Sequence, residues 1–253
     1  MIFIGGLLLA VLPLMWLLLP RKEYNIRHKQ RHGLILFKKI ISIPGVVMMC
    51  FSAYDCFIGI TFFQPALEIH AKTFGFSQGG AALLFLCTSG AYTIGAPLAG
   101  FFLNKKPWGR ISIVAGSLGA ACGILFMGPA PFFAQVLPEK AVWLLVVSLF
   151  GRGLFNAWFF VSILPEMFNC CQEAGLHHSL QLDSMVSCLY TGFINLGSFV
   201  GPFAGGFMNN YLGFPWSTAI VSIFLAAKAL VAAIFFAYNR RTSHTSYEKI
   251  EDK

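Results

Sequence analysis

Charged residues are scarce in this chain. Asp, Glu, Lys and Arg together make up 11% of its 253 residues, whereas 57% of the residues are hydrophobic. A soluble domain carries about 25% charged residues, so this sequence has too little charge to cover a water-facing surface. The scarcity excludes an ordinary soluble domain and predicts an all-α membrane protein, in which each crossing needs roughly 20 apolar residues.

The motifs of several chemistries are also missing. The seven cysteines show no Cys-x-x-Cys spacing, the six histidines form no His-Glu-x-x-His motif, and the chain has no Walker A loop. We therefore predict no enzymatic activity, no metal site and no bound cofactor. The formal net charge of +8 lies mainly between the apolar runs, where basic residues set membrane topology. The expected partner is thus the lipid bilayer and not nucleic acid.

Seven apolar runs approach or exceed the length of a spanning helix. They cover residues 1–19, 46–68, 81–103, 111–127, 142–164, 185–208 and 216–238. The corresponding division is a transmembrane helix that ends a first bundle (1–19), a basic cytoplasmic linker (20–43), a six-helix C-terminal bundle (44–238) and a cytoplasmic tail (239–253). One helix, a long linker and six further helices are typical of the second half of something larger.

The distribution of basic residues supports this count. With the linker in the cytoplasm, fourteen of the eighteen Lys and Arg residues lie on the cytoplasmic side. Lys72 and Lys140 lie outside, and Arg152 and Lys228 lie within helices. Because a miscounted helix would scramble this asymmetry, we predict a multi-pass protein with its N-terminus on the opposite, non-cytoplasmic side.

Three ionisable residues fall near the middle of apolar runs, where a charge costs at least about 2.5–3.5 kcal/mol. Asp55 and Arg152 are expected to meet at the same depth, either as a structural ion pair or in coupling and gating. Lys228 is expected to be structural or to turn its ammonium group toward a water-filled cavity.

Polar side chains at helical spacing predict an internal cavity. Ser148, Arg152 and Asn156 follow each other at i, i+4 and i+8, so they form one stripe that faces the bundle interior. We assign Arg152 and Asn156 to the cavity or to gating.

The 46–68 helix supplies the expected solute or proton site. Gln64 and Glu68 share one face of it, and Asp55 lies on roughly the opposite face. All three therefore line one cavity only if Gly59 or Pro65 breaks the helix. Glu68 has a second interpretation, as a solvated residue at the outer end of the helix.

The 185–208 helix adds Tyr190 and Asn195 to this predicted site. An aromatic ring and an amide suit an amine through cation–π contact and hydrogen bonding. Hydrogen bonding between helices is an equally good interpretation of both residues.

The same helix contains the run GSFVGPFAGG. Gly197, Gly201 and Gly205 repeat every four residues, which leaves one helix face bare and lets a neighbouring helix approach to backbone contact. Pro202 leaves one carbonyl without its helical partner, and Gly206 ends the run. We predict close and movable packing here, as in a transporter.

Two motifs resemble those of the major facilitator superfamily. GSFVGPFAGG resembles the superfamily's antiporter-type Gly-Pro motif, as placed in the eleventh of twelve helices. The segment GFFLNKKPWGR resembles its Gly-x-x-x-Asp-Arg/Lys cytoplasmic loop motif, with Gly100, Lys105 and Arg110 in place and Asn104 where the motif has an acid.

The chain is more closely similar to the vesicular amine transporters of solute carrier family 18, and within them to the vesicular polyamine transporter branch. The similar stretches are FFQPALEIHAKTFGFS, MGPAP, VWLLVVS, PEMFNCCQEAG and GSFVGPFAGGFMNNYLGFPW. In that family, a glutamate implicated in substrate or proton handling typically precedes the Pro-Ala-Leu of the seventh helix. Gln64 occupies this position here and cannot titrate, so Glu68, one turn along, is the expected substitute.

The resemblance implies helices six to twelve of a twelve-helix fold, in which two bundles rock about a central site. It implies proton-coupled antiport of an organic cation, such as a polyamine or monoamine, into vesicles or another endomembrane compartment, with the plasma membrane as the alternative. A missing N-terminal bundle or a partner chain would complete the path.

Two other classes stay open. A non-transporting regulator is favoured by Gln64, by Asn104 and by the missing half. A seven-helix receptor fits the predicted number of crossings, but the chain has neither a DRY-like motif nor NPxxY.

Overall fold

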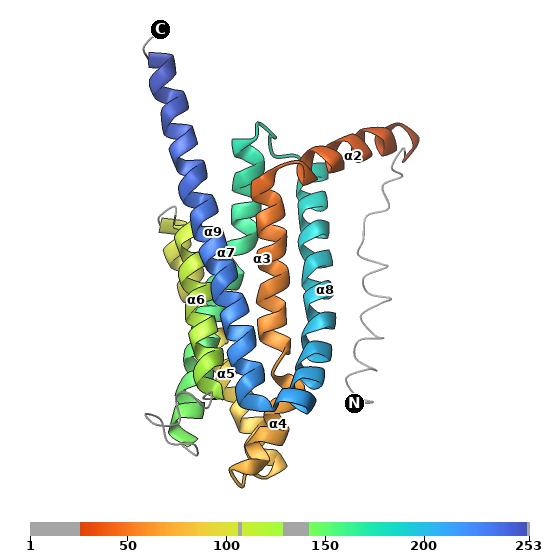
Figure 1. Ribbon diagram of the computed structural model, residues 1–253. Helices are drawn as coiled ribbons and strands as arrows, with labels where there is room; N and C mark the ends of the chain where they lie inside the picture. The colour runs from red at the N-terminus through yellow and green to blue at the C-terminus, as the bar shows by residue number, and fades with distance from the viewer. Residues whose placement is uncertain (1–25, 106–107, 129–141, 252–253) are drawn as a thin grey trace. The chain divides into compact units, whose positions relative to one another are not determined.

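The computed structural model describes residues 26–105, 108–128 and 142–251, and these residues form helices joined by short connections (Figure 1). The helices are α2 (Ile26–Ile41), α3 (Pro44–Thr61), α4 (Gln64–Thr73), α5 (Gln78–Lys105), α6 (Gly109–Met127), α7 (Val142–Glu173), α8 (Leu180–Leu212) and α9 (Phe214–Glu251). The described part of the chain contains no β-strand. The prediction of an all-α protein is confirmed for these residues.

The chain divides into two compact units, residues 1–38 and residues 39–253. The described part of the first unit is helical. α2 begins at Ile26, within the segment that was predicted as a linker. The predicted helix over residues 1–19 lies outside the described residues. The second unit contains the helical bundle, and its last helix continues past the predicted boundary at residue 238 as far as Glu251.

Five helices in the described part of the chain are long and apolar enough to cross a membrane. They span Pro44–Lys72, Gly79–Lys105, Gly109–Met127, Val142–Glu173 and Phe214–Tyr238, and the first of them combines α3 with most of α4. Each coincides with one of the seven predicted crossings. α8 has 33 residues and is long enough to cross a membrane. Its glycines and polar residues, such as Asn195, lower its mean hydropathy, so it is not among the five.

The surface of the bundle carries large apolar side chains. Leu83, Leu86, Phe199 and Ile234 are all more than half exposed. Water-soluble proteins rarely leave such large contiguous apolar patches uncovered, whereas lipid chains solvate them well. The exposed side chains therefore agree with the apolar composition in placing the bundle in a membrane.

The first long apolar segment is broken in the middle. α3 ends at Thr61 and α4 begins at Gln64, because Pro65 has no N–H with which to continue the backbone ladder. Phe62 and Phe63 form the break, and both are buried in an apolar cluster with residues of α6, α7 and α9. The predicted shared cavity of Asp55, Gln64 and Glu68 required a break at Gly59 or Pro65, and the observed break lies between these two residues.

α3 and α8 pack backbone to backbone along the glycine face of α8. A Cβ atom added at Gly197 would overlap the Tyr54 carbonyl oxygen, and one at Gly205 would overlap the Phe62 carbonyl oxygen. At Gly201 the added atom would collide with the Thr61 hydroxyl group. The predicted close approach is confirmed, and the neighbour is α3. α8 stays helical through Pro202.

A second glycine contact joins α6 to α7. Cβ atoms added at Gly116, Gly119 and Gly123 would meet Phe159, Phe155 and Arg152 respectively, each at less than 3 Å. The sequence analysis missed this interface, although glycines at i, i+3 and i+7 share a helix face. The contact fixes the depth and direction of α7, which carries the buried polar stripe.

Candidate solute cavity

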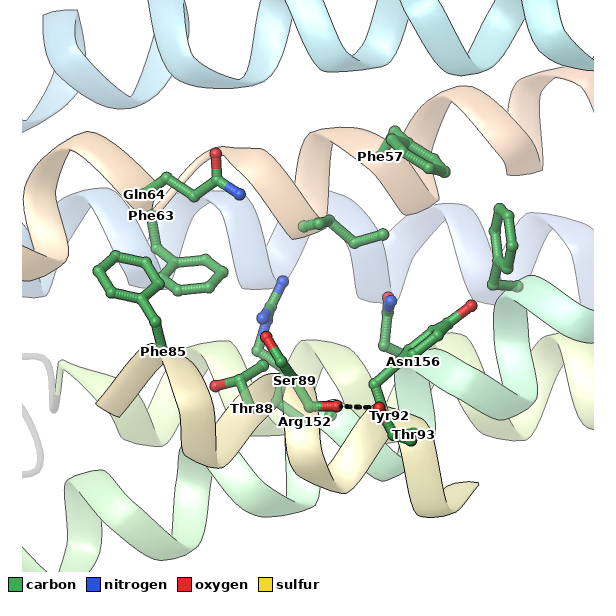
Figure 2. A pocket seen from close by; sticks show the side chains of 13 residues that line it. Phe57, Phe63, Gln64, Phe85, Thr88, Ser89, Tyr92, Thr93, Arg152 and Asn156 are labelled. Carbon is green, nitrogen blue, oxygen red and sulfur yellow. Dashed lines mark hydrogen bonds between the residues drawn. The ribbon is translucent and has the colours of Figure 1, made fainter. Parts of the chain in front are cut away.

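A cavity of about 310 Å³ opens beside the α3/α4 break, lined by α3, α4, α5 and α7 (Figure 2). Its volume lies at the lower end of the range for small-molecule sites. Aromatic rings make up much of its wall, and hydroxyl and amide groups are placed among them. The lining residues are Phe57, Ile60, Phe63, Gln64, Phe85, Thr88, Ser89, Tyr92, Thr93, Arg152, Gly153, Asn156 and Phe160.

Arg152 is the one charged residue in this lining. Its side chain is only 2% exposed, and one Nη group donates a hydrogen bond to the Gly59 carbonyl. In an unbroken helix the Gly59 carbonyl would accept from the Phe63 N–H, but α3 has already ended there. Arg152 therefore donates to a carbonyl at the C-terminal end of α3. The guanidinium carbon also lies 4.1 Å from the centre of the Phe63 ring, a cation–π distance.

The expected ion pair between Asp55 and Arg152 is wrong. Asp55 Oδ2 instead accepts a hydrogen bond of 2.7 Å from Lys228 Nζ, which joins α3 to α9. The Asp55 side chain is 4% exposed and that of Lys228 is 22% exposed. Arg152 and Lys228 were both predicted near the middle of the membrane, so depth alone does not determine which of them pairs with Asp55. The structure places Lys228 of α9 against this face of α3. Lys228 therefore has a structural partner, as one of its two interpretations expected.

The polar stripe of α7 faces the interior as predicted. Ser148, Arg152 and Asn156 are all buried. The Asn156 Oδ1 atom lies 3.6 Å from the Cys56 sulfur, and in Figure 2 Arg152 and Asn156 both reach from α7 toward α3. Arg152 and Asn156 line the cavity, so α7 contributes two of its polar groups, whereas Ser148 lies outside the lining.

The remaining predicted site residues lie in different places. Gln64 lines the cavity. Glu68 lies outside its lining and forms a 3.2 Å pair with Lys72, both side chains being about half exposed. Tyr190 is buried with its ring 5.9 Å from that of Phe160, whereas Asn195 is exposed. The structure thus brings Gln64, Arg152 and Asn156 together and leaves Glu68 and Asn195 apart from them.

Four polar cavity residues on α5 were not predicted from the sequence. Thr88, Ser89, Tyr92 and Thr93 all line the cavity, and the Thr93 hydroxyl donates to the Ser89 carbonyl (Figure 2). Their spacing of i, i+1, i+4 and i+5 in an apolar helix is a signal that could have found them. These residues supply all the hydroxyl groups of the cavity lining.

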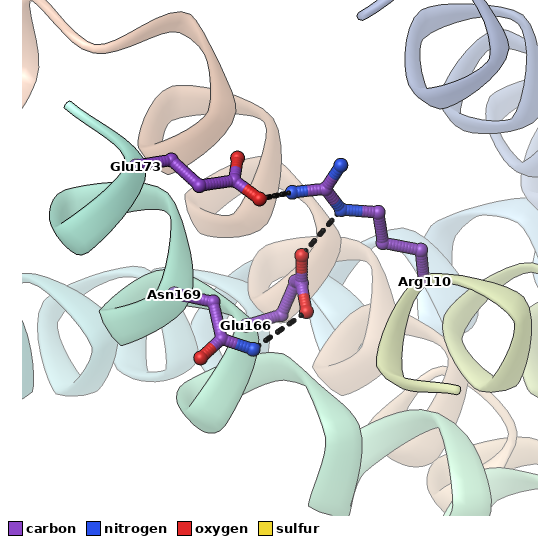
Figure 3. A network of polar contacts seen from close by, with 4 residues as sticks. All are labelled: Arg110, Glu166, Asn169 and Glu173. Carbon is purple, nitrogen blue, oxygen red and sulfur yellow. Dashed lines mark hydrogen bonds and ion pairs between the residues drawn. The ribbon is translucent and has the colours of Figure 1, made fainter. Parts of the chain in front are cut away.

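A second polar cluster joins the start of α6 to the end of α7 (Figure 3). Arg110 Nε lies 2.5 Å from Glu166 Oε1, and Arg110 Nη2 lies 2.5 Å from Glu173 Oε1. Asn169 Nδ2 also donates to Glu166 Oε2 at 3.1 Å. In the loop motif Asn104 stands where an acid is usual, and α7 supplies both acidic partners of Arg110.

The other loop-motif residues make simpler contacts. Asn104 and Lys105 are exposed, and Lys105 Nζ lies 4.1 Å from the centre of the Phe101 ring. Added at Gly100, a Cβ atom would meet nothing within 4 Å, so steric demand does not explain that glycine.

Long apolar helices, backbone-close packing and a buried polar cavity together define a multi-pass integral membrane protein. The chain is homologous to the MFS-type transporter SLC18B1, where MFS denotes the major facilitator superfamily. It is 29% identical to the Rattus norvegicus protein over 250 residues and 30% identical to the Homo sapiens protein over 247 residues. These matches cover 97% and 95% of this chain.

The chain spans about half the length of these curated relatives, 52% in both cases. No model of a known protein family matches it. The predicted resemblance is confirmed at the level of homology, and the relatives are transporters by name.

Proposed function

We propose that this chain forms half of an alternating-access transporter for a small organic solute. The observation that carries the proposal is the cavity beside the α3/α4 break, which combines aromatic walls, hydroxyl and amide groups and a buried charge. Interrupted helices at the interface of two repeats are where secondary transporters bind their substrates. Homology to half of an MFS-type transporter supports the same assignment.

The glycine contacts support a moving helix pair. Few side chains interdigitate where two helices contact each other through glycines. In this proposal α8 can therefore shift along α3 without a large rearrangement of side chains. The α3/α4 break gives the chain a second place at which direction can change. In this proposal the cavity opens to one side of the membrane and then to the other as the bundle moves against its missing counterpart.

Proton-coupled antiport of an organic cation, such as a polyamine or monoamine, into vesicles is the more specific candidate. The rings of Phe57, Tyr92 and Phe160 favour it, because aromatic faces attract cations. However, the cavity lining contains no carboxylate. A cation would therefore depend on Asp55, Glu68 or acids of the missing half for its counter-charge.

The first test is the mass of the native protein, measured by immunoblot with an antibody against residues 242–253. A band at roughly twice 27.8 kDa agrees with a complete two-bundle transporter. A band near 27.8 kDa, with no associated partner chain, contradicts the proposal and favours the non-transporting regulator. Agonist-dependent G-protein coupling would instead favour the receptor.

Uptake into acidified vesicles then tests the cavity directly, with spermidine, a monoamine and benzoate as solutes. We expect Gln64→Leu to lower uptake of the transported solute about tenfold or more, because it removes a hydrogen-bonding group from the cavity wall. Glu68→Gln, one turn away and outside the lining, separates the two candidate positions, and Asn210→Leu, at an exposed amide outside the lining, is the matched control. Loss of uptake in Glu68→Gln alone would move the site to Glu68.

A further inference from the structure

We propose that α2 is an interfacial helix that binds the anionic lipid surface on the cytoplasmic side of the membrane. This inference goes beyond the proposed function, because it concerns neither the solute cavity nor transport. It rests on the charge of α2, on the exposure of its apolar side chains and on its place directly before the first membrane span. Phospholipids with a net negative headgroup, such as phosphatidylserine, are the partner that such a helix fits.

The charge of α2 is of one sign. Its sixteen residues, IRHKQRHGLILFKKII, include five Lys and Arg residues and two histidines, and no Asp or Glu. Arg27, Arg31 and Lys38 follow each other at i, i+4 and i+11, which puts these positions on one side of the helix. A row of like charges without an acid in its own helix is complementary to a negatively charged surface.

The apolar side of α2 is partly uncovered. Leu34, Phe37 and Ile41 follow each other at i, i+3 and i+7, so they share one side of the helix, and they are 64%, 37% and 44% exposed. Ile40 beside them is fully buried, whereas Ile35 is exposed on the basic side. The uncovered stripe gives α2 an apolar face that lipid acyl chains can cover.

The place of α2 in the chain puts its end at the membrane surface. α2 ends at Ile41 and α3 begins at Pro44, where the first membrane span also begins. The two residues between the helices reach at most about 7 Å. The last turn of α2, with the exposed Lys39, therefore lies where this span enters the bilayer. The distribution of basic residues predicts that this end faces the cytoplasm, whose leaflet is the anionic one.

α2 is too short to cross the bilayer itself. Its 16 residues give a length of about 24 Å, against about 30 Å for the hydrocarbon core. A short helix with one basic and one apolar side is stabilised at the boundary between headgroups and acyl chains. An acidic protein would match only the cations, and an apolar protein surface would match only the stripe. An anionic lipid surface matches both.

The test measures backbone hydrogen exchange of α2 in the purified native protein that contains this chain, reconstituted in lipid nanodiscs. One set of discs contains phosphatidylcholine alone, and the other also contains phosphatidylserine with the same acyl chains. We expect the α2 amides to exchange at least about tenfold more slowly in the anionic discs, because each basic residue near such a surface contributes about fivefold to binding. High salt screens the surface charge and is expected to remove this difference.

Variants then assign the effect to charge. Arg27→Gln/Arg31→Gln/Lys39→Gln is expected to abolish the difference between the two discs, while glutamine retains a high helix propensity. The matched control is Arg27→Lys/Arg31→Lys/Lys39→Arg, which keeps every charge and is expected to exchange like the wild type. Leu34→Gln/Phe37→Gln keeps the cations and removes two apolar contacts with lipid, so its α2 amides are expected to exchange faster in both discs.

Three results would overturn the inference. They are equal exchange of α2 in the two discs, a difference that persists in the glutamine variant of the three cations, and a difference that high salt leaves unchanged. Strong and equal protection in both discs would identify a protein segment as the partner of α2, which also overturns the inference. None of these results affects the proposed solute cavity, because the exchange is measured in α2 alone.

Discussion

Gly205→Ala is expected to lower the stability of the bundle by about 1–3 kcal/mol, the scale of overpacking in a filled interface. The added methyl group would overlap the carbonyl oxygen of Phe62, a backbone atom that cannot turn away as a side chain can. α8 must therefore move off α3, or the α3/α4 break must shift. Thermal unfolding of the purified protein, followed by fluorescence-detected size exclusion, measures the loss.

Gly206→Ala is the matched control for this change. Gly206 is the neighbouring residue of the same motif, yet its added methyl group would meet nothing within 4 Å. Because alanine favours a helix over glycine by about 0.5–1 kcal/mol, this variant is expected to be neutral or slightly stabilising. Equal losses in both variants would show that the α3 contact does not set the requirement for glycine.

Asp55→Asn is expected to destabilise the bundle by about 2–4 kcal/mol, toward the lower part of the range for breaking a buried ion pair. The substitution leaves the Lys228 ammonium without its partner between α3 and α9. Partial exposure of Lys228, at 22%, keeps the loss below that of a fully buried cation. The free energy of unfolding in mixed micelles, titrated with a denaturing detergent, is the measurement.

A double-mutant cycle separates the pair from its surroundings. Asp55→Asn/Lys228→Gln is expected to recover part of the loss, because neither charge remains uncompensated. The exposed pair of Glu68 and Lys72 serves as the control, and its neutralisation is expected to cost less than about 1 kcal/mol. Additive losses for Asp55 and Lys228 would mean that their contact does not stabilise the bundle.

The elements of the bundle were largely predictable from apolar runs, since a helix in lipid must satisfy all its backbone groups internally. α5, α6 and α7 begin within three residues of their predicted starts. The ends of α7 and α8 were predicted too early, because both helices continue into polar residues beyond the apolar stretch. Breaking of the 46–68 segment was also foreseeable, because Pro65 interrupts the ladder there.

Site residues were predictable only in part. The stripe of Ser148, Arg152 and Asn156 follows from periodicity alone, because three residues on one face of one helix share their surroundings. Periodicity does not determine which other helices face that stripe. The spacing of Thr88 and Tyr92 marks one polar face of α5, but only the tertiary structure shows that this face borders the same cavity as the α7 stripe.

Composition and periodicity alone established a helical membrane protein with a glycine-faced helix and polar groups turned inward, because these depend on local solvation and helix geometry. Tertiary packing decided the partners. Asp55 pairs with Lys228 and not with Arg152, although all three residues lie near the middle of their helices. The identity of a partner depends on how each helix is rotated about its axis, and that rotation is set by contacts such as those of Gly123 with Arg152 and Gly205 with Phe62.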